Sequence, residues 1–104
     1  MNEQAKQKIE NYLSQSDVVL FMKGTAESPL CGFSARAVAI LNELQVPFET
    51  VSVLEDQEVR DGIKEYGNWP TIPQLYIKKE LVGGSDIMME MFQAGELQEM
   101  FSKK

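Results

Sequence analysis

Apolar residues recur along this chain with two spacings, and the change from one to the other predicts a series of helices and strands. Within Glu3–Ser14 they lie three or four positions apart, which is the spacing of one face of an α-helix. The continuous run VVLFM at 18–22 is rich in β-branched residues and predicts a buried strand. From Gly32 onward the helical spacing returns, at Ala37, Ile40, Leu41 and Leu44.

The middle of the chain repeats this alternation in shorter segments. PFETVSVL, from Pro47 to Leu54, predicts a second strand. QEVRDGIKEYG predicts a helix with Val59 and Ile63 on its buried face and an end at Gly67.

The last third predicts a hairpin and then a helix. QLYIKKELVGG is typical of two short strands with a turn near Lys79-Glu80. Ser85 or Asp86 is expected to cap a final helix that breaks near Ala94-Gly95 and resumes to Phe101. The methionines of this stretch are predicted to fill the core: Met88, Met89, Met91 and Met100.

This order of elements, α-β-α-β-α-β-β-α, predicts an α/β fold. Two strands joined by a helix favour a parallel pair with a right-handed crossover, and the later strands favour an antiparallel hairpin. The pattern is similar to a thioredoxin-like fold, a four-stranded mixed sheet flanked by helices on both faces. Without repeats or linkers, residues 1–104 are expected to form a single domain.

Composition narrows the possible functions. The net charge of −6 argues against general binding to nucleic acid or anionic membranes. No apolar run approaches a membrane span, and the polar N-terminus does not resemble a signal sequence. One cysteine excludes an intramolecular disulfide, so a reducing compartment is expected and the cytoplasm is predicted. The absence of histidine excludes Cys-His and Ser-His dyads.

Cys31 is the first candidate for chemistry. It lies where a loop turns into a helix, and free N–H groups at a helix start favour a thiolate. Such surroundings lower a cysteine pKa from about 8.5 into roughly 3.5–7.5. Lys23, at the end of the preceding strand, adds a positive charge. The alternative is a small buried hydrophobic residue, the commonest role of a free cysteine.

Two further segments suggest a binding site, and each has a simpler explanation. Pro73, in WPTIPQLY, precedes a strand and by itself would be an ordinary turn residue. VGGSDI offers exposed amides for a carboxylate and Asp86 for an ammonium, or simply an N-cap after a hairpin. Arg60 and Lys64 share a helix face, where they either hold a carboxylate or are only solvated.

Together these motifs resemble the monothiol glutaredoxins of the CGFS type. The matching stretches keep the order and spacing of that family over nearly the whole chain: MKG at 22–24, CGFS at 31–34, WPTIPQLY at 69–76 and GGSDI at 83–87. One departure is Ser85, where many members of the family have a second cysteine. That departure excludes any mechanism that resolves through a disulfide with Cys31.

The resemblance implies a glutathione site beside Cys31. Lys23 and Arg60 would hold the glycyl carboxylate, and the backbone of Ile72 before a cis Pro73 would pair with the cysteinyl part. The turn at Gly84, Ser85 and Asp86 would take the γ-glutamyl end. Glutathione carries two carboxylates and one ammonium, and these charges are complementary to the two cations, Lys23 and Arg60, and the one acid, Asp86, that the sequence offers.

The resemblance also implies a [2Fe–2S] cluster that bridges a homodimer and passes to client proteins, with a BolA-like protein as another partner. Such a cluster needs four ligands, and two chains with two glutathiones supply four thiolates. One alternative is a glutathione-dependent oxidoreductase acting on protein–glutathione mixed disulfides through Cys31. A further alternative is an adaptor of the same fold without chemistry.

Overall fold

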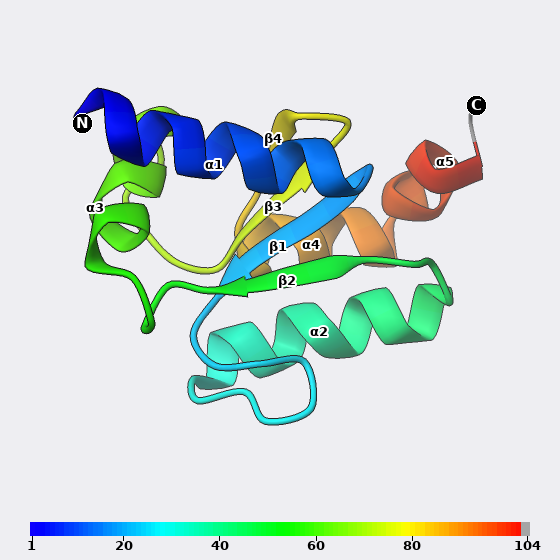
Figure 1. Ribbon diagram of the computed structural model, residues 1–104. Coiled ribbons are helices and arrows are strands. Elements are labelled where there is room, and N and C mark those ends of the chain that lie inside the picture. Colours follow the sequence, from blue (N-terminus) through cyan, green and yellow to red (C-terminus); the bar gives the residue numbers. More distant parts are fainter. Residues whose placement is uncertain (103–104) are drawn as a thin grey trace.

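The sheet of the computed structural model, which describes residues 1–102, has the strand order β2-β1-β3-β4 (Figure 1). The helices and strands are α1 (Glu3–Gln15), β1 (Val18–Met22), α2 (Gly32–Leu44), β2 (Glu49–Ser52), α3 (Gln57–Tyr66), β3 (Gln74–Ile77), β4 (Glu80–Gly83), α4 (Ser85–Gln93) and α5 (Glu96–Ser102).

Strand β1 lies in the middle of this sheet and pairs with two neighbours of opposite direction. It runs parallel to β2, with Val19 opposite Glu49, and antiparallel to β3, with Val19 opposite Tyr76. Strands β3 and β4 form an antiparallel hairpin. The predicted mixed four-stranded sheet is therefore confirmed, although β2 is shorter than predicted and begins after Pro47, which has no N–H to donate.

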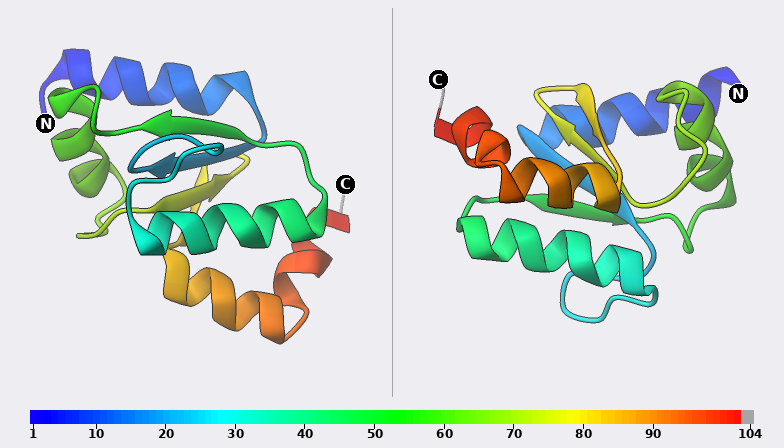
Figure 2. Two further views of the ribbon diagram at one scale, coloured as in Figure 1. Left: turned by 90° about the horizontal axis from the view of Figure 1, so that it is seen from below. Right: turned by 180° about the vertical axis from the view of Figure 1, so that it is seen from behind.

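Helices cover both faces of the sheet, as predicted. Alternate residues of β1 point to opposite faces: Val19 and Phe21 pack with α1 and α3, whereas Leu20 and Met22 pack with α2, α4 and α5. The two further views in Figure 2 show these helix layers on opposite sides of the strands. Because β1 is buried on both faces, it reads as a continuous apolar run in the sequence.

Side-chain caps begin two of the helices. The Asn2 carboxamide oxygen accepts a 2.7 Å hydrogen bond from the Ala5 N–H at the start of α1. The Asp56 carboxylate accepts from the N–H groups of Glu58 and Val59 at the start of α3. Each cap satisfies N–H groups that have no partner within the helix.

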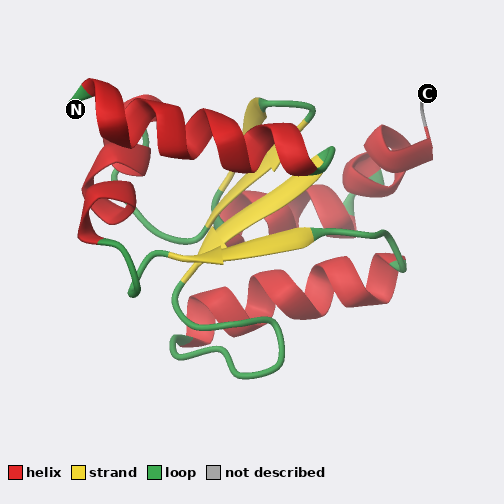
Figure 3. Cartoon of the chain, viewed as in Figure 1, coloured by secondary structure: helices red, strands yellow, loops and turns green. Residues whose placement is uncertain are grey.

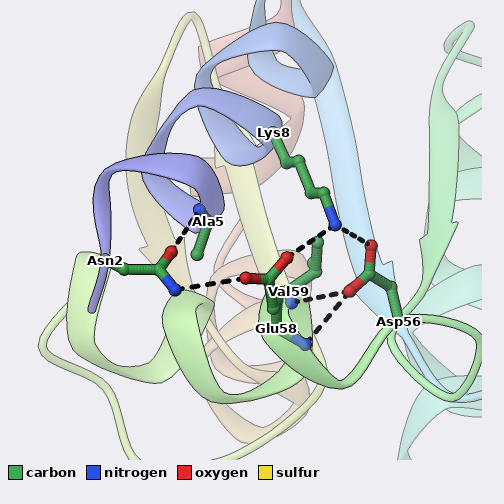
Figure 4. A network of polar contacts seen from close by, with 6 residues as sticks. All are labelled: Asn2, Ala5, Lys8, Asp56, Glu58 and Val59. Atoms are coloured by element: carbon green, nitrogen blue, oxygen red, sulfur yellow. Dashed lines mark hydrogen bonds and ion pairs between the residues drawn. The ribbon is translucent and has the colours of Figure 1, made fainter.

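The same two helices are joined by ion pairs. Lys8 of α1 donates to Asp56 at 3.0 Å and to Glu58 at 2.7 Å, so one ammonium group holds the N-terminal turn of α3 (Figure 4). The carboxamide of Asn2 donates to the other oxygen of Glu58.

Two details of the second half of the chain, the hairpin turn and the start of α4, differ from the sequence prediction. The hairpin turn is at Lys78-Lys79, both with positive φ, one position earlier than predicted. Gly84, not Ser85 or Asp86, is the N-cap of α4: its carbonyl accepts from Met88 N–H, and Ser85 already belongs to the helix.

The prediction of a buried methionine cluster holds for part of α4 only. Met88 is buried, and Met89 and Met91 pack partly against the core. Met100 is exposed, whereas Leu97 and Phe101 of the short helix α5 make the contacts with the core. In the part of the chain that is described, no helix has the length and apolar character needed to cross a membrane.

Candidate functional site

Cys31 is the N-cap residue of α2, as the sequence predicted. Its carbonyl accepts the first helical hydrogen bond, from the Ala35 N–H at 2.9 Å. The loop before it, residues 23–30, folds back on itself through a bridge between Gly24 and Pro29 (Figure 3). Gly24 has a φ of +91°, and a Cβ there would collide with the carbonyl of Ser28, so this turn requires glycine.

The surroundings of Cys31 favour its thiolate. The backbone N–H of Ser34 is the largest cause of a lowered pKa of the thiol, and the Phe33 N–H and the charge of Lys23 act in the same direction against partial burial. Cys31 is half-buried at a pocket wall, and its interpretation as a buried core residue is wrong.

Ser34, in the position where a Cys-x-x-Cys motif has its second cysteine, is completely buried. Its hydroxyl oxygen accepts a 3.1 Å hydrogen bond from the Lys23 N–H. The serine thereby ties the first turn of α2 to the end of β1, and it holds Lys23 and Cys31 at the same edge of the sheet.

A pocket of about 500 Å³ opens beside Cys31. Its lining comes from five segments of the chain: Lys23, Cys31, Phe33, Lys64, Trp69, Pro70, Thr71, Ile72, Pro73, Gly84, Ser85, Asp86 and Ile87. Seven of the eight residues that the sequence suggested as site residues are therefore brought together. Arg60, the eighth, does not belong to this lining, whereas Lys64, one turn later on α3, does.

One wall of the pocket is the segment before β3. The Ile72–Pro73 peptide bond is cis. Gln74 is completely buried behind this wall and donates hydrogen bonds to the carbonyls of Trp69 and Thr71, at 3.0 and 3.2 Å. The Gln74 carboxamide oxygen accepts from the Tyr76 hydroxyl, whose pKa burial raises to about 12. Gln74 therefore fixes the wall from the inside.

The opposite wall is the start of α4. Gly84 passes so close to the first wall that a Cβ would lie 3.1 Å from the Pro73 carbonyl oxygen and 3.3 Å from Trp69 Nε1. No side chain caps this helix. The Ser85 hydroxyl is buried and has no hydrogen-bond partner within residues 1–102. The free amides at the start of α4 thus lie at a pocket whose lining includes Asp86.

Arg36 is a residue that the sequence analysis missed. Its guanidinium Nη1 lies 3.7 Å from Oδ1 of Asp86, and its Cζ lies 6.0 Å from the ring centroid of Phe33. Phe33, Trp69, Thr71 and Gln74 were also missed as individual residues. Trp69, Thr71 and Gln74 lie within a motif that the sequence did single out, but no local spacing connects Arg36 with Asp86, fifty positions later.

Metal ligands are few in the described range. Within residues 1–102 no three side chains of the His, Cys, Asp and Glu types gather in one place. Cys31 is the one thiol that the whole sequence contains.

Comparison with known proteins agrees with this geometry. The family model described as Glutaredoxin matches residues 18–82. A ycf64-like monothiol glutaredoxin of Synechocystis is 58% identical over 96% of this chain and 94% of its own length. The chloroplastic monothiol glutaredoxin-S14 of Arabidopsis thaliana is 54% identical over 96% of this chain, which spans 58% of that relative.

Solved structures support the same relationship. Reduced apo GrxS14 from poplar is 50% identical, with a TM-score of 0.83 over 92% of this chain and 88% of its own. A buckwheat glutaredoxin–glutathione complex also has a TM-score of 0.83, over 94% and 87% of the two chains, but at 22% identity it supports the thioredoxin-like fold alone. Since the family model, the relatives and the pocket beside Cys31 agree, the chain belongs to the glutaredoxin family, in its monothiol group.

Proposed function

We propose that this protein binds glutathione in the pocket beside Cys31 and, as a homodimer, carries a [2Fe–2S] cluster for iron–sulfur proteins. The observation that carries this proposal is the position of the thiol. A half-exposed cysteine with a lowered pKa lies in the wall of a pocket whose other polar groups match a zwitterionic peptide.

The charges around the pocket suit glutathione. Lys23 and Lys64 offer two cations for the glycyl carboxylate, and Arg60, outside the lining, stays a predicted third. The free amides at the start of α4 suit the γ-glutamyl carboxylate, and Asp86 suits its ammonium. The backbone of Ile72, before cis Pro73, is left to pair with the cysteinyl part.

In this proposal the cluster is cargo that the protein carries. One chain provides one thiolate, so a cluster with four sulfur ligands draws on a second chain and on two glutathione thiols. Cys31 fits such a ligand because its sulfur is accessible and its pKa is lowered. Two of the four cluster ligands would then be exchangeable small molecules, which favours transfer of the cluster to other proteins over its permanent storage.

Anaerobic reconstitution with ferrous iron, sulfide and glutathione tests this function. The expected product is a coloured dimer whose visible absorbance depends on glutathione and is lost in Cys31→Ser. Ser102→Ala, far along the chain in α5, is the matched control and keeps the colour. A cluster that stays bound after glutathione is removed would contradict the proposed ligand set.

The competing function is glutathione-dependent thiol–disulfide exchange. The Cys31 thiolate would attack the glutathione sulfur of a mixed disulfide and release the protein thiol; a second glutathione would then release oxidised glutathione and regenerate Cys31. The lowered pKa serves this reaction as well. Fast turnover by a protein that remains a colourless monomer after reconstitution would favour this function over the carrier.

Several finer predictions remain part of the proposal. These are a single domain over residues 1–104, a cytoplasmic location, iron–sulfur client proteins and a BolA-like protein that replaces one subunit of the dimer. The chloroplastic name of the Arabidopsis relative applies to that protein. Cell fractionation and co-purification with the cluster in place test location and partners together.

A further inference from the structure

Arg36, on α2, reaches α4 beside the pocket, although it does not line the pocket itself. Its guanidinium lies 3.7 Å from the Asp86 carboxylate on α4 and 6.0 Å from the Phe33 ring on α2, and both contacted residues belong to the lining. Helices α2 and α4 pack against each other, which keeps this triangle of side chains together.

The Arg36–Asp86 pair is able to open. Its side chains are 46% and 86% exposed, and a pair at this distance and exposure is weak. A ligand ammonium that reaches Asp86 therefore displaces Arg36 at little cost. The displaced guanidinium stays near the pocket, because Arg36 is part of α2 and its guanidinium carbon already lies 6.0 Å from the centroid of the Phe33 ring on the same helix.

The γ-glutamyl end of glutathione bears its ammonium and its carboxylate on the same carbon atom. Asp86 and Arg36 are an acid and a base in contact, and so present the complementary pair of charges to such a group. Arginine suits a carboxylate better than lysine does, since it forms two parallel hydrogen bonds.

We propose that Arg36 is a specificity-determining residue of this site: it leaves Asp86 when the ligand ammonium arrives and pairs with the carboxylate on the same carbon. This inference rests on the proposed binding of glutathione. It predicts that the site selects an α-amino-acid end over an end with an amine alone.

The test uses full-length Cys31→Ser protein, in which no disulfide or cluster interferes with reversible binding. Two ligands are titrated and followed by NMR chemical shifts. One is glutathione, and the other is an analogue with 4-aminobutanoyl in place of γ-glutamyl, which keeps the ammonium but lacks the adjacent carboxylate.

Adding Arg36→Gln is expected to weaken the binding of glutathione about two- to fivefold, which is the range for the loss of an exposed ion pair. The difference is expected to be smaller at high salt, which screens exposed charges. The same change leaves binding of the analogue equal or slightly tighter, because Asp86 is then free. Arg36→Lys is expected to retain part of the preference. Lys6→Gln, an exposed charge on α1, is the control for net charge and leaves the preference unchanged.

Each other result overturns the inference in a recognisable way. Equal weakening of both ligands means that Arg36 acts through general charge, and no change means that it has no role. If the Cys31→Ser parent binds neither ligand, the proposed glutathione site is wrong as well. An unfolding curve of Arg36→Gln identical to that of the parent excludes a folding defect as the cause.

Discussion

Among the individual residues, Cys31 and Ser34 have different roles in the CGFS motif: Cys31 provides the thiol, and Ser34 provides a buried hydrogen bond. Cys31 places its sulfur where the N–H groups of Ser34 and Phe33 lower the pKa of the thiol. Ser34 turns inward and accepts a hydrogen bond from the Lys23 amide. A serine here closes no disulfide, and its buried hydroxyl fixes the position of the cation nearest the thiol.

The pH dependence of alkylation tests the state of Cys31. Iodoacetamide reacts with the thiolate, so the midpoint of the rate against pH should lie below that of the same protein unfolded in urea. Lys23→Gln should raise the midpoint only slightly, because the Ser34 amide is the larger cause. Lys6→Gln serves as the charge control, and equal midpoints for folded and unfolded protein would contradict the assignment.

The same shift has a consequence for stability. A thiol whose pKa is lower in the folded state favours folding at a pH above its unfolded pKa. This contribution disappears as the pH falls through the folded pKa, so the stability difference between the wild type and Cys31→Ser should change across that window.

At the level of elements, strand β3 and the segment before it act as one unit through Gln74. This fully buried side chain donates to the Trp69 and Thr71 carbonyls and accepts from the Tyr76 hydroxyl, which is itself buried and needs a partner. The wall of the pocket therefore depends on a residue that does not line the pocket.

Gln74→Met keeps the volume of this side chain and removes its hydrogen bonds. We expect the free energy of unfolding to fall by roughly 2–4 kcal/mol, since buried polar groups are left without partners. We also expect weaker glutathione binding, because the carbonyls of the wall are released. Urea unfolding and ligand titration measure the two effects, with exposed Gln7→Met on α1 as control. A loss no greater than that of Gln7→Met would show that Gln74 is dispensable.

In the whole molecule, the two helix layers are held in place by different sets of contacts. The layer of α2, α4 and α5 is joined to the sheet by a large apolar cluster. On the other face, α1 and α3 add to their apolar contacts the ion pairs of Lys8 with Asp56 and Glu58. Hydrogen bonds from Lys8 are the largest cause of the lowered pKa of both carboxyl groups.

Acid unfolding tests this attachment. Carboxyl groups with a pKa lowered by folding stabilise the protein above their unfolded pKa of about 4, and they lose that contribution as the pH falls through the folded values. In Lys8→Gln the unfolding free energy should therefore be lower at neutral pH and fall less steeply in acid. Lys6→Gln, on the same helix, should keep the slope of the wild type; equal slopes in Lys8→Gln and the wild type would contradict the argument.

The sequence by itself determined the order of elements, the double-sided burial of β1 and the start of α2 at Cys31. These features depend on the spacing of neighbours along the chain, which a sequence displays directly. It also indicated Lys23 and Cys31, because each lies at the end of an element whose position the pattern predicts, whereas Pro73 and the Gly84–Asp86 turn gained their expected roles only from the resemblance to a family.

Only the tertiary structure decided which side chains meet. It brought Lys64 rather than Arg60 into the pocket, made Gly84 the N-cap of α4, turned Met100 outward and paired Arg36 with Asp86. One turn of a helix, or one residue of register, separates these outcomes from the predicted ones. Such differences are set by how whole elements pack against one another, and local spacing contains no information about that packing.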